Sequence, residues 1–248
     1  MSLSKRAVAS TFVRTFLIQG SWNYHTMLGT GFSWALLPAL RRLHRDDPAA
    51  FEAAAGRHVE HFNAHPYLTG VALGAVVRLE ADGERPETVS RFKTAVRGPL
   101  GSLGDQLVWA GILPLSALVG LALYWAGLRP AWVVAGFLAL YNAAHLALRW
   151  WGLRTGLEAG RDVAQRLSAA GLGERATALR PWLVLATGVV AGLLLARPEG
   201  LVGAGVAWAG LGAGAFGVGL VGGHRVWRPA AVATVAVVAA ISLLGVIR

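Results

Sequence analysis

Long apolar runs dominate the second half of the chain, and they predict membrane-spanning helices. Residues 107–128 and 130–148 contain 22 and 19 positions without Lys, Arg, Asp or Glu, and residues 181–196 contain 16. Two further runs, 200–223 and 229–247, contain 24 and 19 such positions. A helix needs about 20 residues to cross the hydrocarbon core. Four runs are therefore long enough, and the 16-residue run fits a tilted or re-entrant helix.

The apolar stretches of the first half are shorter and alternate with charged residues. Residues 29–40 and 67–77 are uncharged for 12 and 11 positions, which is too short to span and predicts core or re-entrant elements. Residues 48–62 have a helical pattern and begin with a proline, which is favourable in a first helical turn. The segment 81–87 (ADGERPE) is a turn by its glycine and proline.

The charges divide the chain near residue 106. Residues 1–106 hold 12 basic and 9 acidic residues, whereas residues 107–248 hold 11 basic and only 4 acidic ones. The stretch 149–180 carries six arginines, and positive loops stay on the cytoplasmic side. We therefore expect a cytoplasmic-facing and re-entrant core region over 1–106 and a transmembrane helical region over 107–248 with a basic cytoplasmic loop at 149–180. Five crossings from a cytoplasmic N-terminus place the C-terminus outside.

The overall composition supports the membrane assignment. Charged residues make up 15% of the chain, against about 25% in soluble proteins, and the mean hydropathy is +0.51. The absence of cysteine excludes a disulfide scaffold and a cysteine zinc site. The net charge of +10 could indicate nucleic-acid binding, but the basic residues lie between apolar runs rather than in a patch interleaved with aromatics. We expect no nucleic-acid partner and a lipid bilayer instead.

The predicted fold class is an all-α polytopic integral membrane protein, with re-entrant or short helices in the N-terminal half and about five C-terminal apolar segments. The first 14 residues lack the apolar core and cleavage site of a signal peptide, so we expect the N-terminus to stay in the cytoplasm. Several tryptophans fall close to the ends of apolar runs, where an aromatic belt places them.

The first candidate site is the sequence QGSWNY at residues 19–24. Its amide, hydroxyl and aromatic groups suit a sugar, because amides bond to hydroxyls and tryptophan stacks on an apolar ring face. Trp22 and Asn23 are therefore candidate sugar-binding residues. A helix cap with interfacial aromatics gives a similar pattern and is the alternative.

The second candidate site is RHVEHFNAHP at residues 57–66. Three histidines lie at i, i+3 and i+7, and a helix would place them on one face: His58, His61 and His65. A metal site is conceivable, but Glu60 falls one residue too late for an HExxH motif, and we predict no metal and no cofactor. Because Pro66 disfavours helical geometry at His65, a polar face lining a ligand cavity fits better, with Asn63 and His65 before the break.

The third candidate site is GPLGSLGDQ at residues 98–106. Its glycines and proline predict an irregular backbone, which membrane proteins tolerate where it lines a cavity. Asp105 and Gln106 stand at the entrance to a 22-residue uncharged run, and ionisable residues there are functional candidates. Asp105 could cap its own turn, pair with Arg97, or accept bonds from sugar hydroxyls in a polar cavity. The last of these is the favoured hypothesis.

Two further features concern helix packing. Asn142 and His145 are polar within a spanning run and should face the protein interior, whereas Arg149 with its neighbouring tryptophans could anchor a helix end. Gly210/Gly214 and Gly219/Gly223 have the GxxxG spacing that lets helices approach closely.

Taken in order, these segments resemble the IID component of mannose-family sugar phosphotransferase systems (the mannose/fructose/sorbose family). The resemblance covers residues 12–112 and continues weakly to about 165. It is carried by six motifs: QGSWNYHTMLGTGF (19–32), PALRRL (38–43), RHVEHFNAHPY (57–67), LGAVVRLE (73–80), GPLGSLGDQLVW (98–109) and RWWG (149–152). The chain departs from the family pattern at His25, Thr26, Arg97 and Leu113, and in the few residues between its later apolar runs.

The resemblance implies a membrane subunit that does no chemistry alone. Such a subunit pairs with a IIC membrane subunit in the cell inner membrane to carry a hexose such as mannose inward, while soluble IIA/IIB phosphocarrier subunits deliver the phosphate. It further implies an elevator-type transporter and a trimer of IIC/IID pairs. Two alternatives remain open, namely a degenerate IID-like subunit with a regulatory or receptor role, and an unrelated transporter that shares only the apolar composition.

Overall fold

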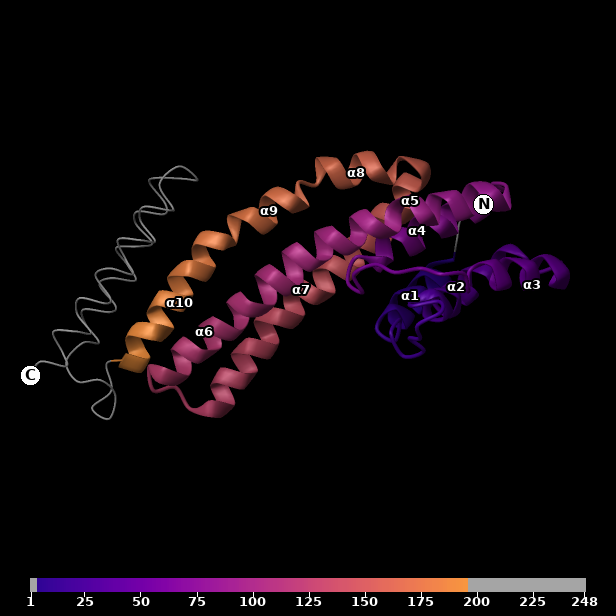
Figure 1. Cartoon of the computed structure of the whole chain (residues 1–248). Helices are drawn as coiled ribbons and strands as arrows, with labels where there is room; N and C mark the ends of the chain where they lie inside the picture. The colour runs from indigo at the N-terminus through magenta and orange to yellow at the C-terminus, as the bar shows by residue number, and fades with distance from the viewer. Residues whose placement is uncertain (1–3, 196–248) are drawn as a thin grey trace, which may run out of the picture. The chain divides into compact units, whose positions relative to one another are not determined.

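The computed structural model describes residues 4–195, and every named element in that range is a helix (Figure 1). The first five helices are α1 (Lys5–Thr15), α2 (Gly29–Leu43), α3 (Pro48–Arg57), α4 (Thr69–Ala81) and α5 (Pro86–Gly104). The remaining elements are the π-helix η1 (Asp105–Ile112), α6 (Leu113–Trp125), α7 (Pro130–Ala159), the 3-10 turn η2 (Gly160–Asp162), α8 (Val163–Ala169), α9 (Leu172–Ala178) and α10 (Arg180–Leu195). The prediction of an all-α fold is confirmed. The predicted runs 200–223 and 229–247, with their GxxxG pairs, lie outside the described residues.

The chain forms two compact units, each of which draws on two separate stretches of sequence. Among the described residues, the first unit combines residues 4–108 with Asn142–Glu174. The second combines Trp109–Tyr141 with residues 175–195. The end of α7 therefore belongs to the first unit, together with the N-terminal helices.

Helix α4 is the core of the first unit. Eleven of its thirteen residues are buried, and it packs against α1, α2, α5 and η2. Its sequence, TGVALGAVVRLEA, is apolar on nearly all sides, as expected for a helix surrounded by protein. The short uncharged stretch 67–77 is thus a core element, one of the two alternatives that its length indicated.

Helices α4 and α7 cross at a pair of matched glycines. A Cβ atom on Gly74 would lie 2.7 Å from the backbone nitrogen of Leu157, and one on Gly156 would lie 2.6 Å from that of Ala75. Gly70 and Gly152 face the same crossing, one turn earlier in each helix. Small residues at this spacing let two helix backbones meet, so GxxxG packing occurs here, at positions that the sequence analysis did not select.

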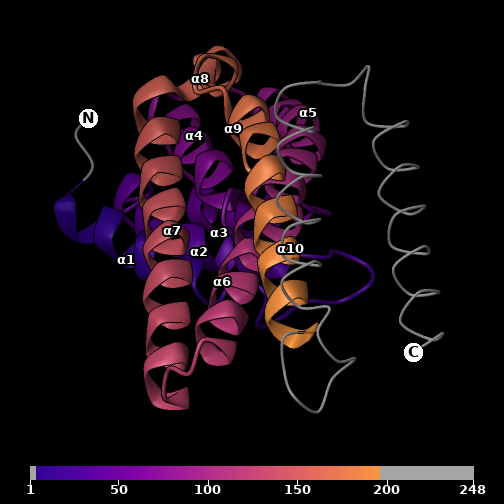
Figure 2. The ribbon, with the colours of Figure 1, turned by 90° about the vertical axis from the view of Figure 1, so that its left-hand side faces the viewer.

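The second unit is apolar on its outside. Helices α6 and α10 lie side by side in both views and pack together (Figures 1 and 2). Large apolar side chains are exposed on these helices and on the first part of α7, among them Trp132 at 61%, Trp182 at 57% and Leu138 at 49%. Among the described residues, two helical stretches are long and apolar enough to cross a membrane, within Pro86–Trp125 and Pro130–Leu193. Exposed apolar helices of this length fit a lipid environment.

Two local predictions were wrong in detail. The helix expected over 48–62 ends at Arg57, because the His58 side chain turns into a buried ion cluster. The irregular backbone expected over 98–106 is helical, with Pro99 inside α5 and a π-helix from Asp105. The stretch 149–180 consists mainly of helices, since α7 continues to Ala159 and α8 and α9 follow, and its place as a cytoplasmic loop stays a prediction.

Candidate functional site

The three polar motifs selected from the sequence lie on neighbouring segments of the first unit. The backbone nitrogen of Leu28 donates to the carbonyl of Phe62 at 2.8 Å, and the nitrogen of Phe62 donates to Thr26 at 3.1 Å. These bonds join residues 22–28 to the loop after α3. That loop in turn packs on the end of α5, where the side chain of His65 covers Gly104. The fold therefore gathers all six predicted site residues on three adjacent segments.

Asn23 organises the first of these segments. Its carboxamide oxygen accepts from the backbone nitrogens of His25 at 3.0 Å and Thr26 at 2.9 Å. Its carboxamide nitrogen donates to the hydroxyls of Thr26 at 2.8 Å and Thr30 at 3.3 Å. Such a side-chain turn fixes the backbone locally. Met27, within the same loop, has a φ of 54°, which is uncommon for a residue other than glycine and is typical of tightly constrained sites.

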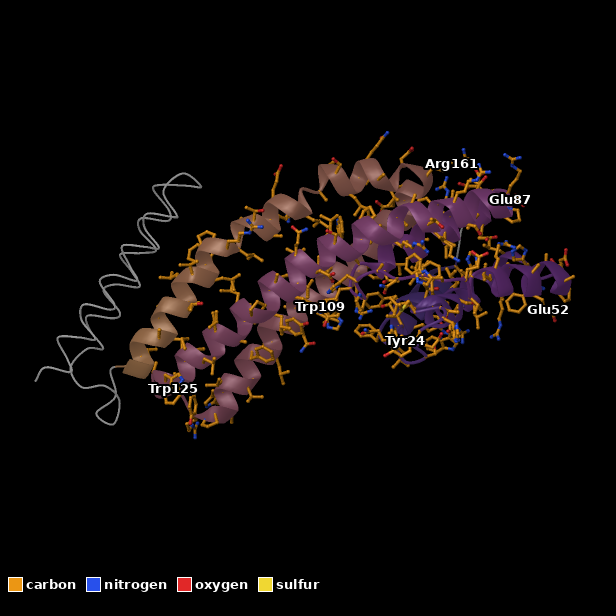
Figure 3. All side chains as sticks on the ribbon, viewed as in Figure 1. Tyr24, Glu52, Glu87, Trp109, Trp125 and Arg161 are labelled. Carbon is orange, nitrogen blue, oxygen red and sulfur yellow. The ribbon has the colours of Figure 1, made fainter. Side chains whose placement is uncertain are left out.

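An exposed aromatic pair stands beside this turn. Tyr24, labelled in Figure 3, is 83% exposed, and Trp22 is 45% exposed. Their rings meet edge to face with centroids 4.8 Å apart. Large exposed rings next to amide and hydroxyl groups are suited to stacking against a partly apolar ligand. The geometry is therefore compatible with the sugar hypothesis for Trp22 and leaves Asn23 as the residue that shapes the loop.

Asn63 and His65 face different surroundings although they are two residues apart. Asn63 is exposed, whereas His65 is 2% exposed and its ring packs against Gly104. The Nδ1 atom of His65 accepts from the backbone nitrogen of Tyr67 at 3.2 Å. Burial, together with the positive charge of Arg149, lowers the pKa of His65 to about 4, so this imidazole is neutral near pH 7.

Asp105 and Gln106 are exposed at the start of the π-helix. Gln106 donates to the hydroxyl of Ser102 at 3.1 Å, whereas the carboxylate of Asp105 makes no hydrogen bond or ion pair among residues 4–195. The capping hypothesis for Asp105 is wrong, because the chain is helical on both sides of it. The pairing with Arg97 is also wrong, since Arg97 bonds to the ring and carbonyl of His61 at 2.9 and 3.3 Å. π-helical turns are frequent at functional sites.

The three histidines of the second motif do not share a helix face. His58 is fully buried beside Glu80, His61 is exposed beside Arg97, and His65 packs on Gly104. Within the described part of the chain, no group of three or more His, Cys, Asp or Glu side chains could hold a metal ion.

A cation–aromatic stack around Arg149 was missed by the sequence analysis. Arg149 is only 4% exposed and donates to the carbonyl of Thr15 at the end of α1. Its guanidinium lies 4.9 Å from the ring centre of Tyr67 and bonds to His145 at 2.6 Å, and His145 stacks on Tyr67. His145 thus faces the protein, as predicted, whereas Asn142 is exposed. In the sequence, Arg149 follows an apolar run and was therefore interpreted as a possible anchor of the helix end. The spacing of residues does not distinguish such an anchor from a buried arginine that bonds to another helix.

A buried ion cluster holds the loop after α3 to the core helix. Glu80, on α4, accepts from Arg57 through both carboxylate oxygens at 2.9 and 2.7 Å and bonds to the ring of His58 at 3.0 Å. Its side chain is 3% exposed. Lys93 of α5 joins the cluster through the carbonyl of Arg57 at 3.1 Å. Burial alone would raise the pKa of Glu80, but the bonds from His58 and Arg57 outweigh it and lower the pKa to about 2.

The protonation of this cluster follows from its geometry. Burial lowers the pKa of His58, so its ring is neutral near pH 7 and donates from Nε2 to the ionised Glu80. Its Nδ1 atom has no hydrogen-bond partner among the described residues. At the centre of the cluster, one ionised carboxylate is therefore held by one bidentate guanidinium and a neutral imidazole, which is a structural arrangement rather than a nucleophile with a base.

A small hollow adjoins the Asn23 turn. Its volume is about 330 Å³, and it is lined by Leu17, Gly20, Ser21, Thr30, Gly31 and Trp34. Thr30 also bonds to Asn23, which connects the hollow to the candidate site. The guanidinium of Arg14 lies 4.5 Å from the ring centre of Trp34, one of the residues that line the hollow. The site as a whole offers hydroxyls, amides and aromatic rings, a set that binds polar, uncharged ligands.

The fold and the site together define an all-α membrane protein whose polar groups gather at the N-terminal helices. The chain matches the family described as the PTS system mannose/fructose/sorbose family IID component over residues 2–196, and it belongs to that family.

Individual relatives support the same assignment. The mannose-specific EIID component of the phosphotransferase system of Escherichia coli (strain K12) is 32% identical over 171 residues, which cover 66% of this chain and 59% of that protein. The fructose permease IID component of Bacillus subtilis (strain 168) is 30% identical over 174 residues, which cover 67% and 61%. The chain thus spans about three fifths of the length of these relatives.

A solved structure shares the fold. The cryo-EM structure of the mannose transporter ManYZ in complex with microcin E492 (MceA) matches with a TM-score of 0.61 and 27% identity, over 77% of this chain and 71% of that one. A second structure, described as a membrane protein, matches with a TM-score of 0.68 and 27% identity over the same shares.

Proposed function

We propose that this chain is the IID membrane subunit of a phosphoenolpyruvate-dependent sugar phosphotransferase system and forms the hexose translocation path together with a IIC subunit. Membership of the IID family supports the assignment of the chain as a IID membrane subunit. The observation that carries the assignment of the site is the gathering of three sequence-distant polar segments on one unit, at residues 22–28, 58–66 and 101–106.

The proposal assigns a role to each part of the site. Trp22 stacks on a sugar ring, and Asn63 and Gln106 bond to its hydroxyls, because these three side chains are exposed. The charged carboxylate of Asp105 accepts the strongest of these bonds. Asn23 and His65 shape the surrounding backbone through the contacts described above. The subunit itself makes and breaks no bond.

The assembly is also part of the proposal. The chain resides in the cell inner membrane with its N-terminus in the cytoplasm, pairs with IIC in an elevator-type transporter, and forms a trimer of such pairs. Soluble IIA/IIB phosphocarriers supply the phosphate. Support comes from the positive-inside distribution of arginines over 149–180 and from the fold shared with a mannose transporter structure.

Sugar uptake by membrane vesicles tests this function. We expect uptake of a radiolabelled hexose when the chain is expressed with a IIC partner from the same genome and with IIA/IIB, and none when either membrane subunit is omitted. Uptake by the chain alone would overturn the subunit assignment. A complex that assembles fully but carries none of the family's hexoses would favour a degenerate, regulatory subunit instead.

The Asp105→Asn variant should assemble normally and lose hexose uptake by at least about tenfold. The carboxylate is exposed and free of protein partners among residues 4–195, so its removal disturbs no contact that holds the fold. An amide offers one acceptor oxygen where the carboxylate offers two, and a hydrogen bond to a charged group contributes about 1.5–3 kcal/mol. Uptake at matched complex abundance is the measurement.

Asp46→Asn is the matched control for this variant, because Asp46 is also exposed and belongs to none of the three segments. We expect uptake by this control to equal that of the wild type. Normal uptake by a well-expressed Asp105→Asn complex would show that the carboxylate does not contact the sugar.

A further inference from the structure

A second hollow lies in the first unit, between the end of α7 and the short helix α8. Its volume is about 480 Å³, within the range of small-molecule sites. The aromatic, charged and hydroxyl side chains that line it are Trp150, Trp151, Arg154, Thr155, Glu158 and Arg166. Both views show α8 at the Ala159 end of α7 (Figures 1 and 2). None of these residues belongs to the candidate sugar site.

The position of this hollow along the chain places it at a membrane surface. The uncharged run 130–148 ends at Arg149, and the first residues that line the hollow follow immediately. Trp150 is 44% exposed at this boundary, where tryptophan side chains prefer the level of the lipid headgroups. The hollow therefore begins where an apolar helix leaves the hydrocarbon.

The charges that line the hollow favour an anion. Arg154 pairs with Glu158 at 3.0 Å, but both side chains are about 60% exposed, and such i,i+4 surface pairs are weak. Arg166 is exposed and makes no hydrogen bond or ion pair among the described residues. Two guanidinium groups thus face one carboxylate, and the planar guanidinium matches phosphate oxygens in a bidentate geometry.

We propose that this hollow binds the phosphate headgroup of an anionic phospholipid. The two arginines hold the phosphate, the hydroxyl of Thr155 donates to it, and the indole rings of Trp150 and Trp151 lie against the glycerol and the first methylenes. A basic pocket beside a membrane-spanning helix on the arginine-rich side of a protein is the usual setting for such lipids. The lipid would tie α8 to the end of α7 at the membrane surface. A soluble phosphate ester shares the anionic group but lacks the acyl chains that the tryptophans would contact.

Lipid retention by the purified protein tests this site without any measurement of transport. The full-length chain, with any subunit that co-purifies, is extracted and incubated with equal amounts of phosphatidylglycerol and phosphatidylcholine, and bound lipid is counted by native mass spectrometry. We expect preferential retention of phosphatidylglycerol. The Arg154→Gln/Arg166→Gln double variant should lose it by roughly twentyfold or more, since each basic side chain near a lipid surface contributes about a fivefold preference.

The control is Arg175→Gln, which removes an exposed arginine of α9 that does not line the hollow. It should retain the lipid like the wild type, and both variants should unfold at the wild-type temperature. Equal retention of phosphatidylglycerol by the double variant and the wild type would overturn the proposal. Equal binding of the two lipids by the wild type would also overturn it. Displacement of phosphatidylglycerol by millimolar inorganic phosphate or hexose phosphate would overturn it too, because it would assign the site to a soluble anion.

Discussion

Replacing Gly156 by alanine should destabilise the protein by about 3 kcal/mol or more and sharply reduce its abundance in the membrane. In an exposed part of a helix the same change stabilises by about 0.5–1 kcal/mol, because alanine is the better helix former. Here the new methyl group would lie 2.6 Å from the backbone nitrogen of Ala75 and even closer to the carbonyl of Val71. Both atoms belong to the buried backbone of α4, so neither can move aside without separating the two helices. Thermal unfolding in detergent and membrane abundance measure the effect.

The same helix offers a matched control. A Cβ on Gly136 meets nothing within 4 Å, so Gly136→Ala should leave the unfolding temperature unchanged or raise it slightly. Gly152→Ala should fall between the two, because its nearest neighbours, the Cγ2 and the backbone nitrogen of Val71, lie 3.0 and 3.2 Å away, farther than those of Gly156. If Gly156→Ala unfolds at the same temperature as Gly136→Ala, then α4 and α7 do not cross at these glycines.

The described helices of the second unit could be predicted from the sequence, because the signal was local. A run of about 20 residues without charge has few alternatives to a membrane helix, since backbone groups in lipid must bond within their own segment. Residues 107–128 accordingly cover most of η1 and all of α6, residues 130–148 form the first part of α7, and residues 181–196 overlap α10. The boundary at residue 148 was wrong because an arginine suggested a helix end, whereas Arg149 is buried and α7 continues for a further ten residues.

The contacts between helices could not be predicted, because they depend on which faces meet. Gly70/Gly74 and Gly152/Gly156 have the same spacing as Gly210/Gly214, and only the fold shows that the first two pairs lie opposite each other. The glycines at 98–104 were interpreted as the sign of an irregular backbone. Gly104 instead lies inside a continuous helical stretch and is required because the His65 side chain occupies the space where a Cβ would be.

The candidate site was predictable as a set of segments but not as a geometry. Residue chemistry selected Trp22, Asn63 and Asp105 as polar or aromatic groups beside breaks in the pattern, and the fold places their segments side by side. The role of Asn23 was not visible, because a side-chain turn depends on the φ and ψ angles of the next three residues. Glu80 was overlooked because it stands in an apolar motif and its partner Arg57 is 23 positions away.

The Glu80→Gln variant should lose about 3–5 kcal/mol of stability near pH 7, which is the cost of removing one partner from a buried ion pair. Glutamine cannot accept both bonds from Arg57, whose guanidinium, 19% exposed, would then lose its only carboxylate partner among the described residues. For a chain of this length we expect a fall of about 6–20 °C in the unfolding temperature. The loop that carries Asn63 and His65 should loosen, because Arg57 and His58 attach its beginning to α4.

The pH dependence distinguishes this cluster from a general loss of packing. The folded state holds the pKa of Glu80 at about 2, below its ordinary 4.5, so the unfolded chain binds the proton first and stability is lost as the pH falls from 4.5 towards 2. Burial also lowers the pKa of His58 below its ordinary 6.5. The contribution of the neutral His58 ring to folding stability is therefore complete above about pH 6.5 and declines as the pH falls below that value. The wild type should therefore be most stable above pH 6.5, and its advantage over Glu80→Gln should shrink between pH 5 and pH 3.

Asp82→Asn is the control for this comparison, since it breaks an ion pair that Arg78 forms at the exposed end of the same helix. Both side chains of that pair are about half exposed, so the change should lower stability by less than about 1 kcal/mol. Its unfolding curve should follow that of the wild type at every pH. If Glu80→Gln shows the same small effect, or if its deficit is as large at pH 3 as at pH 7, the ionised carboxylate of Glu80 does not hold the loop to the core.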